Sequence, residues 1–189
     1  MNKYQRGLSL IELMVAVLIS TLLILGVTEL FSRTSAADRA NTELARMQES
    51  GRLALEIIGQ DARRAGYQGC VAADTSTPFP SGGTLPDDAI SSTATTNLTF
   101  RYATPGSGCG PVALNFEPAI TYTNAGSGIS RNNDPILDNA TMQVTFIPAG
   151  NAAFARAINV QITVSDSRQG NENLANRTFS ATYELRNRL

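Results

Sequence analysis

A single carboxylate, Glu12, stands inside an otherwise uncharged apolar segment that runs from Leu8 to Thr28. Between Leu13 and Val27 the only polar side chains are those of Ser20 and Thr21. The segment has about the 20 residues that a helix needs to cross the hydrocarbon layer of a membrane. An ionisable side chain in such a segment costs roughly 2.5–3.5 kcal/mol even on the mildest scale. Glu12 therefore requires a partner that compensates its charge.

The two cysteines, Cys70 and Cys109, lie beyond this segment, in the part of the chain that would be exported. A disulfide between them is expected in an oxidising compartment and would contribute about 4 kcal/mol on loop-entropy grounds. Two free buried thiols are the alternative. A catalytic or metal-binding role is disfavoured, because the cysteines do not form a C-x-x-C pair and the chain has no histidine to activate a thiol.

Composition and motifs exclude several other kinds of site. The absence of histidine removes imidazole-based catalysis, and a net charge of −1 excludes a strongly basic nucleic-acid binder. The glycine-rich run Gly106–Gly110 is expected to be a turn, because it lacks the lysine of a phosphate-binding loop. The run Asn132–Asn139 offers oxygen ligands for Ca²⁺, but without the EF-hand spacing a solvated loop is preferred. No metal, no cofactor and no enzymatic activity are expected.

The residues around Glu12 resemble the cleavage and methylation signature of type IV pilins and pseudopilins, in the run Arg6-Gly7-Leu8-Ser9-Leu10-Ile11-Glu12-Leu13-Met14. The resemblance implies that prepilin peptidase cleaves after Gly7 and methylates the new amino group of Leu8. The family usually has phenylalanine at this position, and Leu8 keeps it apolar. Two other interpretations remain open: a secretory signal peptide with a cleavage site at Ser35-Ala36-Ala37, and a plain single-span anchor.

Cleavage after Gly7 would give Glu12 a partner. The new α-amine has an ordinary pKa near 7.7–8.0 and is largely protonated at neutral pH. Leu8 and Glu12 are four positions apart, so on a helix they lie on one face. The carboxylate can then neutralise the amine of its own chain or of a neighbouring chain, and pairing between chains would set their axial register. The helix dipole also favours a glutamate at the start of a helix, but this does not explain the apolar surroundings of Glu12.

Helix-forming composition continues without proline from Thr28 to Arg64. An apolar stripe at spacings of three and four predicts an amphipathic helix with one face against a sheet; it consists of Leu44, Met47, Gly51, Ala54, Ile58, Ala62 and Ala65. One helix from Leu8 to Ala65 competes with two helices joined by a turn near Ser32–Ala37. The second alternative arises because Gly26 and Gly51 each weaken a helix by about 1 kcal/mol.

Beyond Gly66 the sequence is typical of β structure, after an irregular loop over 71–96. The predicted strands are Leu98–Tyr102, Val112–Phe116, Ile120–Thr123, Met142–Ile147, Ile158–Val164 and Thr178–Leu185. One helix followed by a run of strands predicts an α+β, type IV pilin-like fold, with an antiparallel sheet on the helix. The expected parts are a leader (1–7), a membrane-spanning half-helix (8–28), an amphipathic half-helix (29–66) and a β-rich domain (67–189).

The end of the predicted helix makes the resemblance to pilins more specific. It is similar to the corresponding stretch of PilW-type minor pilins, in the run Arg63-Arg64-Ala65-Gly66-Tyr67-Gln68-Gly69-Cys70. The resemblance implies a structural subunit, a minor type IV pilin that helps to prime pilus assembly and is placed at the pilus tip. The runner-up is a minor pseudopilin of a type II secretion system. A membrane-anchored or secreted enzyme or binding module is an alternative of a different class.

The same resemblance implies the partners and the location of the protein. The partners would be other minor and major pilins through the N-terminal helix, prepilin peptidase, the inner-membrane assembly platform and a tip adhesin. The protein would cross the inner membrane once before assembly and then belong to the pilus on the cell surface. Its globular domain would lie in the periplasm and later outside the cell.

Overall fold

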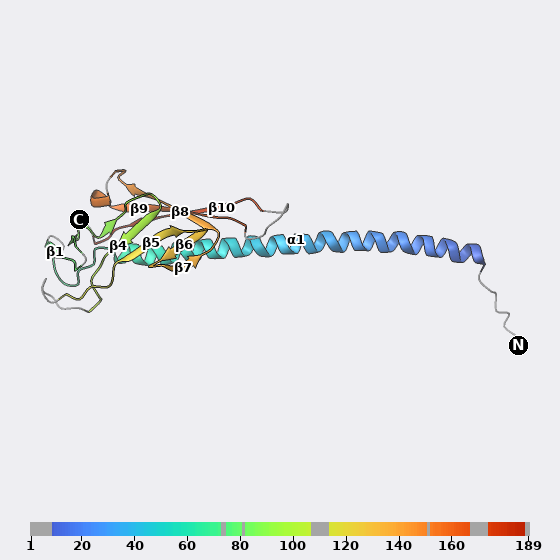
Figure 1. Ribbon diagram of the computed structural model, residues 1–189, viewed down its shortest axis with the longest axis horizontal. Helices are drawn as coiled ribbons and strands as arrows, with labels where there is room; N and C mark the ends of the chain where they lie inside the picture. The colour runs from blue at the N-terminus through green and yellow to red at the C-terminus, as the bar shows by residue number, and fades with distance from the viewer. Residues whose placement is uncertain are drawn as a thin grey trace. The chain divides into compact units, whose positions relative to one another are not determined.

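The computed structural model describes residues 9–72, 75–80, 82–106, 114–150, 152–166 and 174–187. The fold is α+β: one long helix, α1 (Leu10–Arg64, 55 residues), is followed by antiparallel β-sheets (Figure 1). The chain divides into two units, Met1–Leu44 and Ala45–Leu189. The predicted α+β class is confirmed.

Helix α1 is continuous, so the alternative of two helices with a turn near Ser32–Ala37 is wrong. Within the expected turn, Arg33, Ala36 and Ala37 favour a helix, and Arg33 also forms a surface ion pair one turn back, in which its Nε lies 2.7 Å from Glu29 Oε1. The helix ends at Arg64, and Gly66 then adopts the left-handed backbone conformation, with φ +79°. The side-chain amide of Asn187 donates to the last carbonyls of the helix, at 3.2 Å from Arg63 O.

The second part of α1 buries the face that the stripe predicts. Met47, Gly51, Ala54, Ile58 and Ala62 are all buried. The opposite face is exposed, as expected for an amphipathic helix; it carries Arg46, Glu49, Arg52, Glu56, Gln60 and Arg63.

Three antiparallel sheets follow the helix. The two-stranded sheet is β1 (Thr77–Pro78) with β2 (Thr84–Leu85). The five-stranded sheet has the order β3 (Ile90–Ser91), β4 (Asn97–Phe100), β5 (Ile120–Ala125), β6 (Gly128–Arg131), β7 (Asp134–Leu137). The three-stranded sheet has the order β10 (Arg177–Glu184), β9 (Ala157–Val164), β8 (Ala140–Ile147), and the short 3₁₀ helix η1 (Ala152–Phe154) precedes β9.

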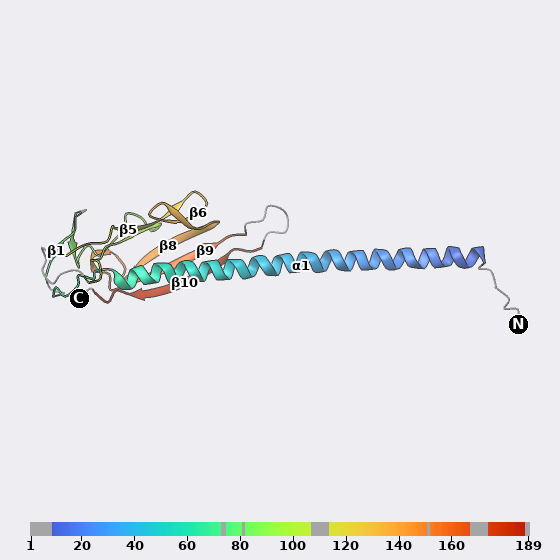
Figure 2. The ribbon, with the colours of Figure 1, turned by 90° about the horizontal axis from the view of Figure 1, so that it is seen from below.

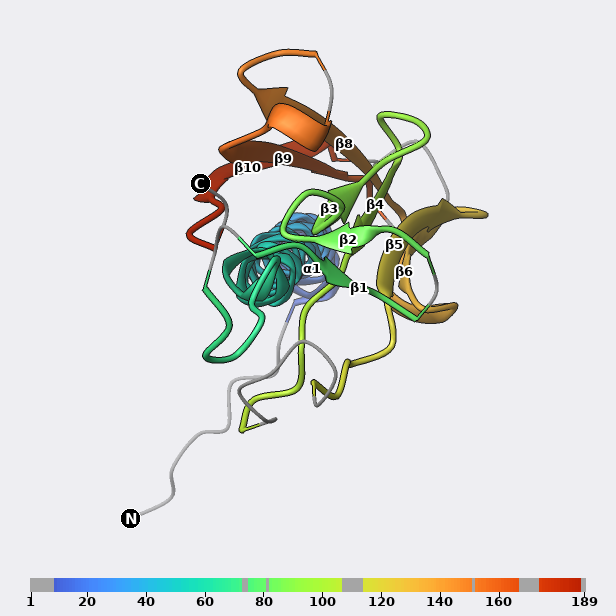
Figure 3. The ribbon, with the colours of Figure 1, turned by 90° about the vertical axis from the view of Figure 1, so that its left-hand side faces the viewer.

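The core lies between the second part of α1 and the two larger sheets, which form separate layers in Figure 3. Its largest fully buried side chains come from both sheets and the helix; they include Tyr122, Phe100, Ile58, Met142 and Ile162. The alternating burial along β8 and β9 is that of strands with one face on a core.

The strands predicted at Ile120–Thr123, Met142–Ile147, Ile158–Val164 and Thr178–Leu185 correspond to β5, β8, β9 and β10, and the strand predicted at Leu98–Tyr102 corresponds to β4. In the predicted strand Val112–Phe116 the described residues form only one bridge, Ala103 to Phe116. The loop predicted over 71–96 contains the short strands β1, β2 and β3, and the hairpin of β6 and β7 was not predicted. These strands are only two to four residues long, too short for a recognisable period.

Two glycines of α1 make room for aromatic side chains of β10, which runs alongside the helix (Figure 2). A Cβ atom on Gly51 would lie 2.5 Å from the ring of Phe179, and one on Gly59 would lie 2.5 Å from the ring of Tyr183. Tyr183 is tethered, because its hydroxyl donates to Leu55 O at 2.6 Å. Glycine has a lower helix propensity than alanine at both positions, but its missing side chain allows β10 to pack closely against the helix.

Replacing Gly59 by alanine is expected to destabilise the domain by about 1–3 kcal/mol, because the new methyl group displaces the Tyr183 ring and breaks its hydrogen bond to Leu55. The matched control is Gly26→Ala on the same helix, where a Cβ meets nothing within 4 Å. Urea unfolding of the full chain in detergent micelles, followed by circular dichroism, measures both variants. Equal stability of the two variants would show that the ring of Tyr183 moves aside without cost.

Candidate functional site

The first part of α1 presents an apolar surface on all sides. Its large apolar side chains from Leu10 to Phe31 are each 50–76% exposed. Within the described residues, α1 is the one helix that is long and apolar enough to cross a membrane. A helix that is hydrophobic all round requires lipid or neighbouring helices to cover it.

The hydroxyl groups of this segment do not interrupt the apolar surface, because they bond back to the helix. Ser20 Oγ donates to Val17 O at 2.9 Å, and Thr21 Oγ1 donates to Leu18 O at 2.8 Å. Thr28 Oγ1 donates to Ile24 O at 2.8 Å. Such internal bonds satisfy polar side chains that have no access to water.

Glu12 lies in the first turn of α1 and is exposed. The amide of Leu13 donates to Ser9 O at 3.1 Å, which places Ser9 at the N-cap and Glu12 three positions into the helix. The helix dipole favours a carboxylate at that position, although this does not explain an apolar surface around it. The predicted cleavage residues Gly7 and Leu8 lie outside the described residues, so the pairing of Glu12 with the amine of Leu8 stays a prediction.

A second group of polar side chains, which the sequence analysis missed, lies between α1 and the five-stranded sheet and is buried except for part of Arg131. Asp61 on α1 is only 3% exposed. Tyr122 Oη donates to Asp61 Oδ2 at 2.5 Å, and Arg131 Nε donates to the same oxygen at 3.0 Å. Tyr102 Oη donates to Asp61 Oδ1 at a longer 3.4 Å. The Asp61 cluster, formed by Asp61, Tyr102, Tyr122 and Arg131, fixes α1 to β5, β6 and the residues after β4.

The surroundings of the Asp61 cluster keep Tyr122 and Arg131 protonated, because the pKa of each is raised. Burial, followed by the hydrogen bond to Asp61, raises the pKa of Tyr122 far above its ordinary value of 10. Burial also lowers the pKa of Arg131, but the hydrogen bonds to Asp61 and Tyr122 outweigh it and the net change is upward. The cluster therefore works as a fixed set of donors around one carboxylate, which suits a structural role better than proton transfer. A sequence signal was present, because Asp61 stands in the apolar stripe beside Ile58 and Ala62.

Raised tyrosine pKa values predict a loss of stability in alkaline solution. Burial, with a smaller contribution from Glu56, raises the pKa of Tyr183 to about 12, whereas an unfolded tyrosine ionises near 10. Between these values the folded state binds more protons, so the free energy of unfolding falls as the pH rises from about 10. Urea unfolding of the full chain at several pH values tests this. Tyr183→Phe should make the fall less steep, and a stability that does not change between about pH 9 and 11.5 would refute the argument.

The other candidate residues from the sequence take up different roles. Cys70 lies exposed in the turn after α1 and is not a free thiol, whereas Cys109 lies outside the described residues. Gly106 lies in a turn with φ +81°, and the rest of its glycine-rich run is outside the described residues. No group of three or more residues that could hold a metal ion occurs in the part of the chain that the structure describes.

The asparagines of the 132–139 run have a backbone role. Asn132 and Asn133 adopt left-handed conformations, with φ values of 51° and 71°, in the turn between β6 and β7. Asparagine tolerates this region better than most residues. The side-chain oxygen of Asn132 also accepts a hydrogen bond from the amide of Thr121 at 2.7 Å. The run expected to be a solvated loop is therefore a turn at Asn132 and Asn133 that leads into strand β7, Asp134–Leu137.

Comparison with known families gives one finding. Residues 2–28 match the family model described as "Prokaryotic N-terminal methylation motif". Neither the curated proteins nor the solved structures gave a match to this chain.

The matched motif covers the predicted cleavage site, Glu12 and most of the exposed apolar part of α1. The motif supports a type IV pilin-like or pseudopilin-like protein that prepilin peptidase processes, and it fits a protein anchored in the inner membrane by its N-terminal helix. The amino-terminal segment of this chain therefore carries the prokaryotic N-terminal methylation motif, the prepilin-type signature of type IV pilin-like and pseudopilin-like proteins.

Proposed function

We propose that this protein is a minor type IV pilin that helps to prime pilus assembly and takes a place at the filament tip. The observation that carries the proposal is the lone carboxylate of Glu12 at the start of an apolar helix surface that is exposed from Leu10 to Phe31. Such a surface moves from lipid into a bundle of like helices with little hydrophobic gain, so pairing of charges and close helix packing select the position of each subunit.

The proposed parts of the chain follow from this role. Prepilin peptidase removes residues 1–7, whose Lys3 and Arg6 keep the leader on the cytoplasmic side. Residues 8–28 form the membrane-spanning half-helix, residues 29–66 the amphipathic half-helix, and residues 67–189 the domain outside the membrane. In an oxidising compartment the domain forms a Cys70–Cys109 disulfide, which the absence of a free thiol at Cys70 supports.

Mass spectrometry of the protein purified from its own membranes tests the proposal. The expected amino terminus is an N-methylated Leu8, and reduction of the sample should add two hydrogens for one disulfide. A chain that begins after Ala37 would show a cleaved signal peptide, and an intact Met1 would show a plain anchor. Either result would remove the basis of the pilin assignment.

The filament to which the protein belongs requires a second measurement. Deletion of the chromosomal copy should reduce the number of surface pili if the protein is a minor pilin. A normal number of pili together with a loss of secreted proteins would instead identify a minor pseudopilin of a secretion system, since both classes share the methylation motif.

A further inference from the structure

The outer edge of β8, the edge that faces away from β9, is occupied along most of its length by other parts of the domain. The amide of Ala140 donates to Ser127 O at 3.0 Å, and the amide of Val144 donates to Thr95 O at 2.8 Å. Between them, the side chain of Asn124 makes two bonds to Met142, at 2.9 Å to its amide and 3.1 Å to its carbonyl. Ala140, Met142 and Val144, the alternate residues whose main chain faces this edge, therefore each bond to another part of the domain in the place of a neighbouring strand.

The next alternate residue on this edge is Phe146. In an antiparallel strand every second residue directs its N–H and C=O to the same side, so Phe146 directs both groups to the same edge as Ala140, Met142 and Val144. Within the described residues, no turn or side-chain group is bonded to the Phe146 amide on that edge. The following residue of the same parity is Pro148, which has no N–H to offer.

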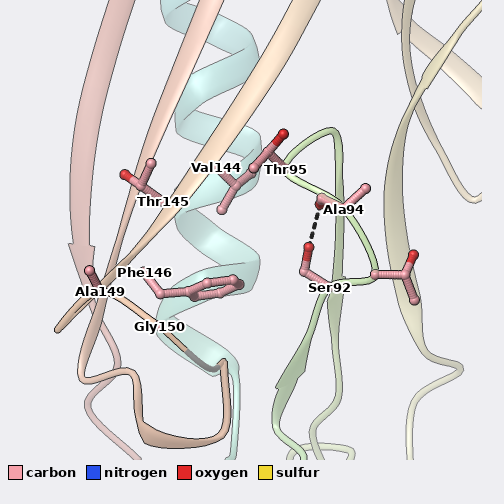
Figure 4. A pocket seen from close by; sticks show the side chains of 9 residues that line it. Ser92, Ala94, Thr95, Val144, Thr145, Phe146, Ala149 and Gly150 are labelled. Carbon is pink, nitrogen blue, oxygen red and sulfur yellow. Dashed lines mark hydrogen bonds between the residues drawn. The ribbon is translucent and has the colours of Figure 1, made fainter.

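A hollow of about 320 Å³ opens at this point, between the end of β8 and the loop before β4 (Figure 4). This volume is at the lower limit of the range typical of ligand pockets. Its lining residues are Ser92, Thr93, Ala94, Thr95, Val144, Thr145, Phe146, Ala149 and Gly150. None of these side chains is ionisable, so an ionic ligand would find no counter-charge in the lining.

The hydroxyl groups nearest the loop are already engaged, which limits the chemistry that the hollow can offer. Ser92 Oγ donates to Ala94 O and to Asn97 O, the latter at 2.8 Å, and Thr93 Oγ1 accepts from the side chain of Asn97. A sugar, which needs several free side-chain groups, would be held poorly. Besides the hydroxyl groups of Thr95 and Thr145, the polar groups that remain in the lining are the N–H and C=O of Phe146, and a paired N–H and C=O fit another main chain.

We infer that the end of β8 is a docking site for an extended, uncharged peptide segment of a partner protein, which adds to the outer edge at Phe146. The segment donates one amide to Phe146 O and accepts one bond from Phe146 N, and so continues the row that Thr95 O begins at Val144. The small residues Ala94, Ala149 and Gly150 leave room for its backbone, and the Phe146 ring covers one of its side chains. The site uses neither Glu12 nor the apolar part of α1, so it stands apart from the proposed assembly role.

Nuclear magnetic resonance of the ¹⁵N-labelled full chain in detergent micelles tests the inference. The probe is the peptide acetyl-Thr-Ala-Thr-Thr-amide, blocked at both ends. It has the sequence of residues 93–96, the loop whose Thr95 carbonyl accepts from Val144 at the same edge. At millimolar peptide the Phe146 amide should move to lower field, and its hydrogen exchange should slow at least tenfold. The amides of Met142 and Val144, which already have partners, should change less than twofold in exchange rate.

Two controls separate docking at the edge from other outcomes. Ala149→Trp should fill the hollow and abolish the shift, whereas Ala125→Trp, at another exposed alanine in the β5–β6 hairpin, should leave it unchanged. A peptide with N-methylated backbone amides should bind at least tenfold more weakly. No change at Phe146, equal binding of the methylated peptide, or a response to glucose and galactose in place of the peptide would each overturn the inference.

Discussion

Replacement of Glu12 by leucine is expected to leave the protein in the membrane but to reduce its incorporation into filaments at least about tenfold. The substitution makes the apolar segment more hydrophobic, so insertion does not suffer. In the assembled filament the α-amine of Leu8 would lose its counter-charge, and a charge without a partner in a poorly hydrated bundle costs several kcal/mol. Since about 1.4 kcal/mol corresponds to a factor of ten, the loss should be large.

Immunoblots of sheared pili and of inner membranes measure the two pools for each variant. Glu12→Gln, which keeps the shape and polarity of the side chain but not its charge, should behave like the leucine variant. Glu29→Gln is the matched control, because it removes a carboxylate from an exposed ion pair of the same helix. Normal incorporation of the Glu12→Gln protein would refute charge pairing as the selective step.

Replacement of Asp61 by alanine should destabilise the domain by about 3 kcal/mol. Asp61 is the common acceptor of Tyr122 and Arg131. Its loss leaves the buried Tyr122 hydroxyl without an acceptor and the Arg131 charge without a counter-charge, with only the 3.2 Å bond from Arg131 Nε to Tyr122 Oη remaining. Asp38→Ala, at an exposed aspartate of the same helix, is the control and should change stability by less than about 0.5 kcal/mol. Urea unfolding of the full chain in micelles provides both values.

A double-mutant cycle identifies the source of the Asp61 effect. If the ion pair carries it, the Asp61→Asn and Arg131→Gln changes together should cost clearly less than the sum of the two single changes. Strictly additive losses would mean that the two side chains act independently, and the cluster would then not be what fixes the sheet to α1.

The local features of the fold could be predicted from the sequence because they depend on patterns within a few residues. The apolar run after Gly7, the stripe from Leu44 to Ala65 and the alternation in the segments of β9 and β10 each identify an element. The prepilin-type motif is also local, and its prediction is confirmed by the match over residues 2–28. The continuity of α1 could not be decided, because glycine and serine propensities favour a break while tertiary and membrane surroundings compensate them.

The tertiary structure alone decided which residues far apart in the sequence meet. Gly51 counted as a weak point of the helix in the sequence, whereas in the structure Phe179 of β10 packs against it, and Tyr183 packs against Gly59 in the same way. In the sequence Asp61 is notable only as a charged residue within the apolar stripe, and only the sheet brings Tyr122 and Arg131 to it. The open edge at Phe146 likewise depends on where Thr95 and Asn124 end their contacts with β8. Periodicity reports which face of an element is buried, but the partner on that face is set by long-range packing, which leaves no regular trace along the chain.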